Sequence, residues 1–501
     1  MKLMKTDSYF RKKSQRSYPT VFTGMISILI LLFSINGYAE EGKHVPIPLM
    51  EKQAGISDIS MTEAVFLALE NNHALRATQN GHIAAKWAHR QAWTQLFPAI
   101  SLESNYTRLD DETVSRANAL GNEITMYFPD STGTLQPVTI EIPQSVFRNG
   151  YETSISGRLL LLNPAVWNGV SLAGTSKDLA AGEVQTAIRA TVHQTLRSFV
   201  ALLRLQSLVR LQEEHVDQAV RNTEQAERLF RVGKYSEADV LRWRVEEAQQ
   251  SGILTETRQG LKVSALTLEN LIGVDPTASI SPDSVLPGAL RREMSRYRSM
   301  NEEAWEEFLA HPLMDVVGLN PQLTVMEQSK RLAKLQHRQS LTAFMPSLTV
   351  AGSYGWQNND TPDLDGDKTW AVSATVSLPL FTSFSNYSGY QTTKFQMKQT
   401  AETVEDARRS LLLGAEAART AIRTAVSQLR LAETSLESAR RGFEIQENAF
   451  KLGRLSNLEW IDANLALRSA EQSHTTSYYD LVLAIIDYYE FTGEILSLLE
   501  A

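Results

Sequence analysis

The sequence contains an internal duplication, which constrains the fold more than any other feature. Residues 72–75 (NHAL) and residues 320–323 (NPQL) each open a helical pattern, with an offset of 248 residues between them. Further along the chain, residues 230–236 (FRVGKYS) match residues 450–456 (FKLGRLS) with an offset of 220. The first copy therefore contains 28 extra residues, which we place in the segment 109–150. A duplication of this kind predicts that one set of elements is used twice.

Each copy carries two segments of about ten residues in which apolar and polar side chains alternate, as in a strand with two unlike faces. The apolar sides are Ile100, Leu102 and Tyr106, then Tyr151, Ile155 and Leu159 in the first copy, and Leu348, Val350, Tyr354 and Trp356, then Trp370, Val372, Ala374, Val376 and Leu378 in the second. A tilted strand of this length spans a bilayer, and Trp356 and Trp370 at one end predict an aromatic girdle. For one segment alone, a half-buried hairpin of a soluble protein is the alternative.

A helical pattern of unusual length follows each strand pair, over residues 165–231 and 384–451. Globular helices average about 11 to 12 residues, so helices this long need neighbouring helices along their sides. In the second copy a heptad seam supports this interpretation, with Ile422, Leu429, Leu436, Phe443 and Phe450 in one position and Ala425, Ala432 and Ala439 three positions after it. We interpret the seam as a coiled-coil core.

Each long helix ends at a glycine-containing turn, after which a second helix returns. Gly233 and Gly453 suit the left-handed position that closes a helix C-terminus. Ser236 and Ser456 stand where the N-cap of the returning helix belongs. The returning helices cover residues 237–272 and 457–490. The sequence thus predicts two helical hairpins that point the same way.

The first 39 residues read separately from the rest of the chain. Basic residues precede an apolar run at 21–33, and Gly37-Tyr38-Ala39 follows, which indicates a secretory signal peptide. The apolar run is too short to cross about 30 Å of hydrocarbon as a helix. We therefore expect export and divide the chain into a signal peptide (1–39), an N-terminal periplasmic segment (40–60), a first repeat (61–272), an inter-repeat linker with one short helix (273–316), a second repeat (317–492) and a C-terminal tail (493–501).

Composition excludes several classes of protein. The chain has no cysteine, which excludes disulfide frameworks, thiolate metal sites, cysteine nucleophiles and a lipid anchor on cysteine. With 43% hydrophobic and 21% charged residues it is too apolar for a disordered chain. Its mean hydropathy of −0.23 is too low for a helical membrane transporter. A formal net charge of −8 does not favour nucleic acid as a partner.

The number of strands in one chain bears on assembly. A β-sheet in lipid cannot leave the edge of an outer strand unpaired, because each backbone N–H or C=O group without a hydrogen bond costs several kcal/mol there. Four strands cannot close a barrel, so either two copies supply eight strands or three copies supply twelve. Eight strands enclose a space filled by their own side chains, whereas twelve leave a water-filled lumen, which the polar faces favour. We therefore predict an α+β membrane protein, a trimer with a 12-stranded β-barrel to which each chain contributes 4 strands.

Several short motifs recur in an order that matches one known family. They are residues 60–64 (SMTEA) with residues 68–72 (ALENN), Phe97-Pro98 before the first strand, the paired Val-Gly and Leu-Gly turns, and residues 271–273 (LIG). Over residues 58–492 the chain resembles TolC-like outer-membrane efflux proteins. The resemblance implies a trimer in the outer membrane of a Gram-negative bacterium, continued into the periplasm by a long α-helical barrel. Its tip would meet a periplasmic adaptor (membrane fusion protein) and an inner-membrane pump.

The resemblance also implies roles for residues at the hairpin tips. The family's acidic constriction falls on Glu459 and Asp462, and the aspartate of its first tip falls on Asp239. Its gating tyrosine matches Phe450 and its second-tip arginine matches Leu455, so the polar latch of the family is missing here. The residues at which an adaptor would dock are Val232, Gly233, Lys234, Leu452, Gly453 and Arg454. The alternative for Lys234 and Arg454 is that these two side chains contact only water and no adaptor.

Physical chemistry alone also suggests an interpretation of Glu459 and Asp462. Glu459 and Asp462 are three apart and share a helix face, so threefold symmetry would arrange them in rings that attract cations. The alternative is that acids in a first turn compensate the helix dipole. Both readings stay open for Glu459, and the ring is favoured for Asp462.

No catalytic, cofactor or metal site is predicted. The chain has no phosphate-binding loop, and His82 and His89 lack a third ligand at zinc-site spacing. Asp363, Asp365 and Asp367 surround a glycine at the wrong position for a calcium loop. The segment 109–150 contains a small hairpin, which is an inert flap, a cap over the pore or a receptor site.

The leading hypothesis is an exit duct without catalysis, which belongs to a tripartite efflux or type I secretion system and conducts passively what a pump delivers. A wide lumen contacts its cargo weakly, so we expect specificity for drugs, metals, siderophores or proteins to lie in the pump. A soluble periplasmic coiled-coil scaffold and a stand-alone diffusion porin are the alternatives.

Overall fold

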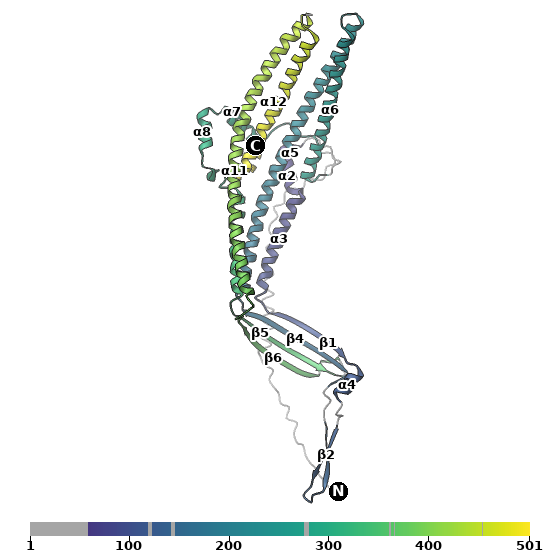
Figure 1. Ribbon diagram of the computed structural model, residues 1–501, viewed down its shortest axis with the longest axis vertical. Coiled ribbons are helices and arrows are strands. Elements are labelled where there is room, and N and C mark those ends of the chain that lie inside the picture. Colours follow the sequence, from purple (N-terminus) through teal and green to yellow (C-terminus); the bar gives the residue numbers. More distant parts are fainter. Residues whose placement is uncertain are drawn as a thin grey trace, which may run out of the picture. The chain divides into compact units, whose positions relative to one another are not determined.

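In a computed structural model of the chain, the four alternating segments form one antiparallel sheet (Figure 1). The strands are β1 (Ala99–Arg108), β4 (Asn149–Leu162), β5 (Ser347–Asn358) and β6 (Asp367–Ser377), in the order β1-β4-β5-β6. Because β4 pairs with β5, the sheet joins the two copies of the duplication. The structure describes residues 59–118, 123–141, 146–274, 280–359, 362–364, 366–452 and 454–500. The predicted signal peptide and residues 40–58 lie outside these ranges, as do Gly453 and Asp365.

The register of the sheet confirms the predicted alternation of its faces. Leu102 pairs with Ile155, Ile155 with Tyr354, and Tyr354 with Trp370, so the apolar sides of all strands lie on one face. On the other face Ser101 pairs with Ser156, and their hydroxyl oxygens are 2.8 Å apart. The sheet therefore has one apolar and one polar face, as the period of two requires.

The two outer strands have open edges. Among the residues that the structure describes, β1 pairs only with β4, and β6 pairs only with β5. Every residue of β1 and β6 is exposed, although Leu102, Trp370 and Val372 are large and apolar. An exposed apolar sheet with free edges is unstable alone in water and calls for further strands and an apolar environment.

Two long helical hairpins continue from the sheet (Figure 1). The first consists of α5 (Pro164–Arg231) and α6 (Glu237–Ile272), and the second of α11 (Ser385–Lys451) and α12 (Asn457–Thr492). Helices α5 and α12 also pack against each other, which joins the hairpins. The predicted heptad seam is confirmed over much of its length, since Ile422, Leu429 and Leu436 are buried together with Ala425 and Ala432.

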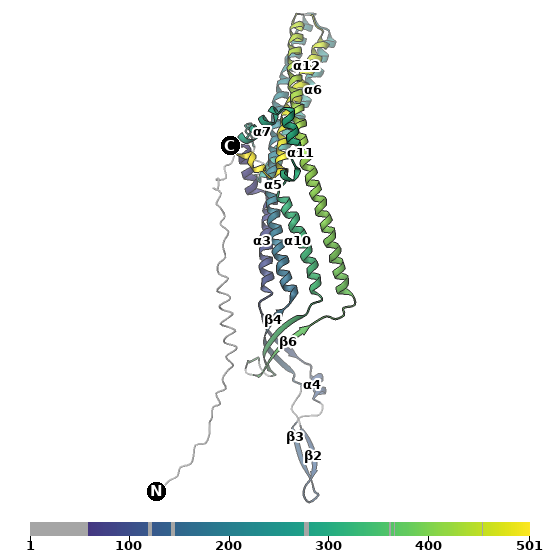
Figure 2. The same ribbon diagram turned by 90° about the vertical axis from the view of Figure 1, so that its left-hand side faces the viewer.

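Three shorter helices begin the two copies. They are α2 (Met61–Asn71) and α3 (His73–Thr94) in the first and α10 (Pro321–Thr342) in the second. Helices α3 and α10 pack along α5, and α10 also packs along α11 (Figure 2). Helix α3 leads to β1 through Phe97-Pro98, and helix α10 leads to β5 through Met345-Pro346. None of the described helices is both long and apolar enough to cross a membrane.

The segment between the copies differs from the prediction of one short helix. The part that the structure describes contains α7 (Gly288–Ser299), α8 (Glu302–Ala310) and α9 (Leu313–Val316). A short 3₁₀ helix, η1 (Ile495–Leu499), lies in the C-terminal tail. The prolines were the source of the error, because Pro287 and Pro312 stand at helix N-caps instead of interrupting helices.

The linker helices contribute aromatic residues to the main hydrophobic core. Tyr297 and Trp305 pack on Phe308, and Phe308 packs on Tyr488. Arg419 of α11 is 3% exposed and holds the end of α8 in place. Its Nη1 donates hydrogen bonds to the carbonyl oxygens of Phe308 (3.1 Å) and His311 (2.8 Å). Carbonyl groups at a helix C-terminus lack partners within the helix, so a buried arginine satisfies them.

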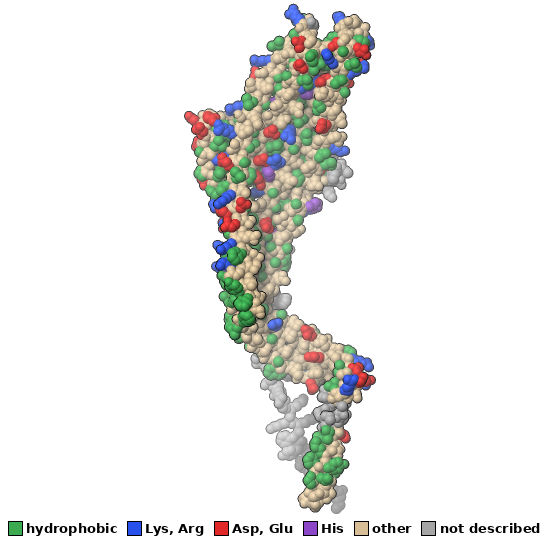
Figure 3. All heavy atoms as spheres, viewed as in Figure 1, with side chains coloured by type: hydrophobic (Ala, Val, Ile, Leu, Met, Phe, Trp, Pro, Cys, Tyr) green, Lys and Arg blue, Asp and Glu red, His purple; other side chains and the backbone are tan. Residues whose placement is uncertain are grey.

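The extra segment of the first copy contains the predicted small hairpin, β2 (Glu123–Pro129) and β3 (Leu135–Glu141), and also α4 (Asp111–Ala117), which we did not predict. Asp110 caps α4, and its carboxylate accepts hydrogen bonds from the backbone N–H groups of Glu112 and Thr113. Hydrophobic side chains gather over β2 and β3 and over the N-terminal part of α11, whereas charged side chains gather over the part with the helical tips (Figure 3).

Candidate functional site

The turns of both helical hairpins lie at the same end of the molecule (Figure 1). At the first turn the predicted left-handed glycine is confirmed, since Gly233 has φ of +72°. This conformation lets the N–H groups of Gly233 and Lys234 donate hydrogen bonds to the carbonyls of Phe230 and Leu229, both at 2.9 Å. Such bonds close the C-terminus of α5 within one turn.

Both returning helices begin with a reciprocal cap. Ser236 Oγ accepts a hydrogen bond from the N–H of Asp239 (3.2 Å), and Asp239 Oδ2 accepts one from the N–H of Ser236 (3.1 Å). Ser456 and Glu459 repeat this arrangement at 3.3 Å and 2.9 Å. The N-caps predicted at Ser236 and Ser456 are confirmed, and the capping box satisfies backbone donors that would otherwise be free.

The caps set the electrostatics of the acidic residues. Hydrogen bonds from Ser456 lower the pKa of Glu459, so it stays ionised. Hydrogen bonds from the side chains of Ser236 and then Asn457 lower the pKa of Asp239. Asn457 is the first residue of α12, so its side chain lies near Asp239 of α6. Asp462 is exposed, and its carboxylate makes no hydrogen bond or ion pair with any residue that the structure describes.

An aromatic cluster lies just behind the turns and joins the hairpins. Trp243 of α6 and Trp460 of α12 are 3% and 4% exposed, and their ring centroids are 5.1 Å apart. Phe450 packs on Trp460 at 5.7 Å, and Leu455 is a partly buried member of the same cluster. Phe450 and Leu455 therefore contribute apolar packing at the tips.

A buried polar network lies on the sheet side of this cluster. Arg468 of α12 forms an ion pair with Glu246 of α6, and these residues are 7% and 8% exposed. Glu246 Oε1 also accepts a hydrogen bond from Gln250 Nε2 at 3.0 Å. In turn Gln250 Oε1 accepts one from Gln212 Nε2 of α5 at 2.7 Å. The network therefore crosses from one hairpin to the other.

A second polar connection between the hairpins lies farther from the tips. Glu471 of α12 accepts a hydrogen bond from His215 Nε2 of α5 at 3.2 Å if that nitrogen carries the proton. The guanidinium of Arg440 lies 3.8 Å from the other carboxylate oxygen of Glu471. The hairpins are thus joined by alternating apolar and polar contacts.

The tip residues predicted for docking are accessible. Val232 and Leu452 are 68% and 69% exposed, and Lys234 and Arg454 are exposed as well. The remaining member of the second turn, Gly453, lies outside the described residues. Exposed apolar residues between cations form a surface suited to contact with another protein.

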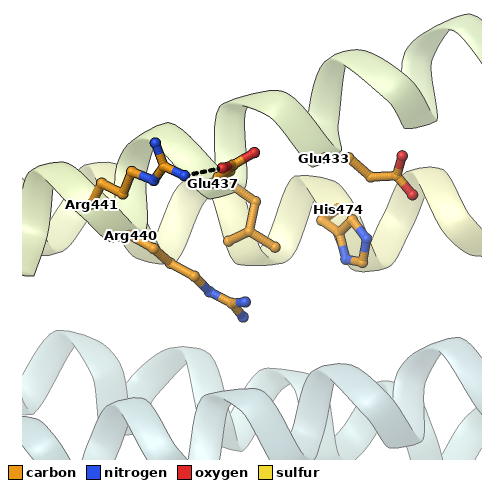
Figure 4. A pocket seen from close by; sticks show the side chains of 6 residues that line it. Glu433, Glu437, Arg440, Arg441 and His474 are labelled. Carbon is orange, nitrogen blue, oxygen red and sulfur yellow. Dashed lines mark hydrogen bonds and ion pairs between the residues drawn. The ribbon is translucent and has the colours of Figure 1, made fainter.

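A pocket of about 350 Å³ lies on the second hairpin, beside Leu436 of α11. It is lined by Glu433, Glu437, Arg440 and Arg441 of α11 and His474 of α12 (Figure 4). Arg441 donates to Glu437 at 2.6 Å, while Arg440 points away from that pair. The pocket therefore contains carboxylates and guanidinium groups in equal number and does not select an ion by charge.

The predicted girdle tryptophans lie together at one end of the sheet. Tyr354 pairs with Trp370 across β5 and β6, and the rings of Tyr354 and Trp356 are 4.8 Å apart. Trp370 is 75% exposed. Both tryptophans lie on the apolar face, as do Tyr106 and Tyr151, whose rings are 4.9 Å apart.

The two histidines considered for metal binding lie on one helix, α3. His89 Nε2 accepts a hydrogen bond from Trp93 Nε1 at 3.3 Å on α3, the helix that also carries His82. Within the ranges that the structure describes, no group of three or more histidine, aspartate and glutamate residues converges as metal ligands.

Sequence analysis located the turns and caps but missed Trp243, Trp460, Glu246 and Arg468. A signal for these residues exists in α6, where the buried positions Val240, Trp243, Glu246, Gln250 and Leu254 recur every three or four residues. Charged and amide side chains within such a stripe indicate a buried polar network.

Comparison with known proteins identifies related chains. A family model described as "Outer membrane efflux protein" matches residues 65–274 and 315–494. Outer membrane protein TolC of Vibrio cholerae is 22% identical over 278 residues, which are 50% of this chain and 62% of that protein. The match thus spans less than two thirds of that relative. Outer membrane efflux protein BepC of Brucella suis is 21% identical over 88% of this chain and 86% of its own length.

Solved structures share the fold. The Campylobacter jejuni CmeC outer membrane channel superposes with a TM-score of 0.69 at 15% identity, covering 89% of this chain and 91% of that one. The outer membrane protein VceC of Vibrio cholerae superposes with a TM-score of 0.67 at 14% identity, covering 86% and 96%.

Proposed function

This chain belongs to the outer membrane efflux protein family, and from that premise we propose that it is a non-catalytic exit duct in the outer membrane of a Gram-negative bacterium. It conducts substrates passively after an inner-membrane pump has delivered them through a periplasmic adaptor, in a tripartite efflux or type I secretion system. The observation that carries the proposal is a four-stranded sheet with one apolar face, one polar face and two open edges, which continues into two long helical hairpins.

Three copies would complete the barrel. The open edges of β1 and β6 can pair with those of neighbouring copies, and closure satisfies every backbone group in lipid. Twelve strands place the apolar face with Trp356 and Trp370 toward lipid and the polar face toward water. In the same trimer six helical hairpins would line a periplasmic helical barrel. The extra hairpin β2–β3 would then belong to a loop at the cell surface.

The hairpin tips would form the constriction and the docking surface. We assign the constriction to Asp239, Phe450, Glu459 and Asp462. Asp462 is best placed to act on ions, because it is exposed, whereas the carboxylate of Glu459 is engaged in its cap. The adaptor would contact the residues of the two turns, namely Val232, Gly233, Lys234, Leu452, Gly453 and Arg454.

Conductance of the purified protein in planar lipid bilayers tests this function. We expect insertion as a heat-modifiable oligomer, small currents and cation selectivity. In the double variant E459Q/D462N the currents rise and the selectivity falls, because the negative rings are lost while glutamine preserves the cap. The variant E303A/E306A is the control, since it removes two exposed carboxylates at the same spacing from α8.

Other outcomes distinguish the alternatives. A large open conductance of the unmodified protein without partners would identify a stand-alone diffusion porin. A stable single copy in neutral buffer without affinity for lipid would identify a soluble periplasmic scaffold. Unchanged conductance and selectivity in E459Q/D462N would contradict the constriction assignment but not the duct.

A further inference from the structure

We propose that Glu246, Arg468, Trp243 and Trp460 form a clasp that holds the two helical hairpins of one copy together near the tips, and that the clasp opens when the duct widens. The inference rests on the proposed function, because only a duct needs its tips to separate. It concerns contacts within one chain, between α6 of the first hairpin and α12 of the second.

The carboxylate of the clasp is fixed to the first hairpin. Glu246 Oε1 accepts a hydrogen bond from Gln250 Nε2, and Gln250 accepts one from Gln212 of α5. Gln212 Nε2 also donates to the backbone carbonyl of Gln250 at 3.1 Å. These residues all belong to α5 and α6. Arg468 is therefore the group through which the second hairpin engages this network.

The arginine of the clasp is only partly satisfied. Its Nη1 contacts Glu246, but its Nε and Nη2 are buried and have no hydrogen-bond partner in the part of the chain that the structure describes. The Nδ2 of the neighbouring Asn464 is in the same condition. Burial accordingly lowers the pKa of Arg468, although Glu246 opposes that shift.

A buried ion pair with unsatisfied donors stabilises its closed arrangement only weakly. The desolvation of both ions offsets much of their attraction, and separation of the hairpins would return the free donors to water. Removal of one partner is different, because it leaves the other charge buried without compensation. The pair is therefore suited to a contact that must hold and also release.

The tryptophans form the apolar half of the clasp. Trp243 and Trp460 meet at 5.1 Å and are almost fully buried, and Phe443 packs on Trp460 at 5.4 Å. Phe450 has no hydroxyl group, so it supports Trp460 by packing alone. This cluster lies between the tips and the ion pair, whose two residues are also buried.

Distances between spin labels test the clasp. The chain has no cysteine, so cysteines at Glu237 and Leu458 give unique labelling sites on α6 and α12. Both positions are exposed. Labelled chains are diluted with unlabelled chains, so that double electron-electron resonance reports distances between the two labels of one copy. Measurement in detergent makes the readout independent of conductance.

We expect R468M to open the clasp, because Glu246 is then buried without a partner charge. The population with a long label distance rises about tenfold relative to the unmodified protein. The double variant E246Q/R468M removes both charges and returns the distances toward those of the unmodified protein. The control R244M breaks the pair of Arg244 with Glu227 (2.7 Å), which lies within the first hairpin, and leaves the distances unchanged.

Conductance in bilayers is measured on the same variants. A rise in R468M that is reversed in E246Q/R468M supports the clasp as a gate. Unchanged label distances in folded R468M, or an equal shift in R244M, would overturn the inference. If no variant conducts but R468M still lengthens the distance, the exit duct is wrong and the clasp stands as a joint between hairpins.

Discussion

At the scale of single residues, Asp487 and Glu490 of α12 are two nearby carboxylates whose pKa values are shifted in opposite directions. Asp487 is partly buried, yet His193 (2.8 Å) and Arg197 hold its pKa below the ordinary value. Glu490 lies one turn further along α12, and its Oε2 is buried without a hydrogen-bond partner among the described residues. Burial raises its pKa, although His193 and Arg189 act against the shift.

We predict that E490Q stabilises the protein at neutral and alkaline pH. A carboxyl group whose pKa is raised above 4.5 on folding contributes stability only at low pH and loses it as pH rises through the folded value. The amide lacks this loss, so the variant should be more stable by about 1 kcal/mol near pH 8 and equal to the unmodified protein below about pH 4. Melting temperatures from circular dichroism across this range measure the difference.

Asp487 supplies the control of opposite sign. Its pKa is lowered on folding, so its contribution is present above the ordinary value of 3.8 and is lost as pH falls through the folded value. D487N should therefore melt at a lower temperature at neutral pH, and the deficit should shrink in acid. The same sign of change in both variants would contradict our account of the two environments.

At the scale of elements, the hairpin turn at Gly233 depends on a backbone conformation that other residues adopt at a cost. We predict that G233A destabilises the turn by about 1 kcal/mol, because a left-handed φ strains a residue with a Cβ atom. The added methyl group would meet no atom within 4 Å, so the effect comes from the backbone alone. Hydrogen exchange of the amides in residues 230–236 measures it, and faster exchange is expected.

Gly442 is the matched control for Gly233, because its backbone does not have the left-handed conformation. It lies inside α11, and a Cβ atom there would also meet nothing within 4 Å. Alanine is the better helix former by about 1 kcal/mol, so G442A should slow exchange in α11. If both substitutions slowed exchange, left-handed strain at the first turn would be excluded.

Strands and long helices could be predicted from the sequence because their signals are periodic and occur twice. The alternation around Tyr354 and Trp370 fixed both faces of the sheet, and the serine caps fixed where α6 and α12 begin. Helices α7, α8 and α9 could not be counted in advance, since each is short and lies beside prolines that also occur in loops. Packing against the main core, as at Tyr297, decides that they form.

The contacts of the candidate site were less accessible to sequence analysis. A cap joins residues three apart and can be read locally, as at Ser456 and Glu459. The pair of Glu246 and Arg468 joins residues 222 apart in different copies of the duplication. A charged residue in a helix is usually solvated, so only the packing of α6 near α12 reveals that these two are buried.

At the scale of the whole molecule, the chain is incomplete as a membrane structure. The apolar face of the sheet is exposed at Trp370, Val372 and Val376, although the long helices bury a core of their own. Strands β1 and β6 carry backbone groups that no described strand satisfies. Both deficits are removed together if other copies and lipid surround the sheet.

We predict that cysteines placed on the two outer strands form cross-links between copies. One cysteine replaces Ser101 on β1, and a second is moved along the polar face of β6 from Thr369 through Ala371 and Ser373 to Thr375. At least one pair should give oligomers that end at three chains on denaturing gels after oxidation, because β6 of one copy would lie beside β1 of the next. Such a ladder cannot arise from the two strands of one chain, which β4 and β5 separate.

The pair S156C/S353C provides the control, because these positions are register partners on β4 and β5 within one chain. Its cross-link should leave the chain single on the same gels. A ladder ending at two chains would favour an eight-stranded barrel over twelve strands, and the polar face would then have to pack inside it. If no position on β6 cross-links to β1 of another copy in membranes, the outer strands do not close a shared barrel, and their open edges require another partner.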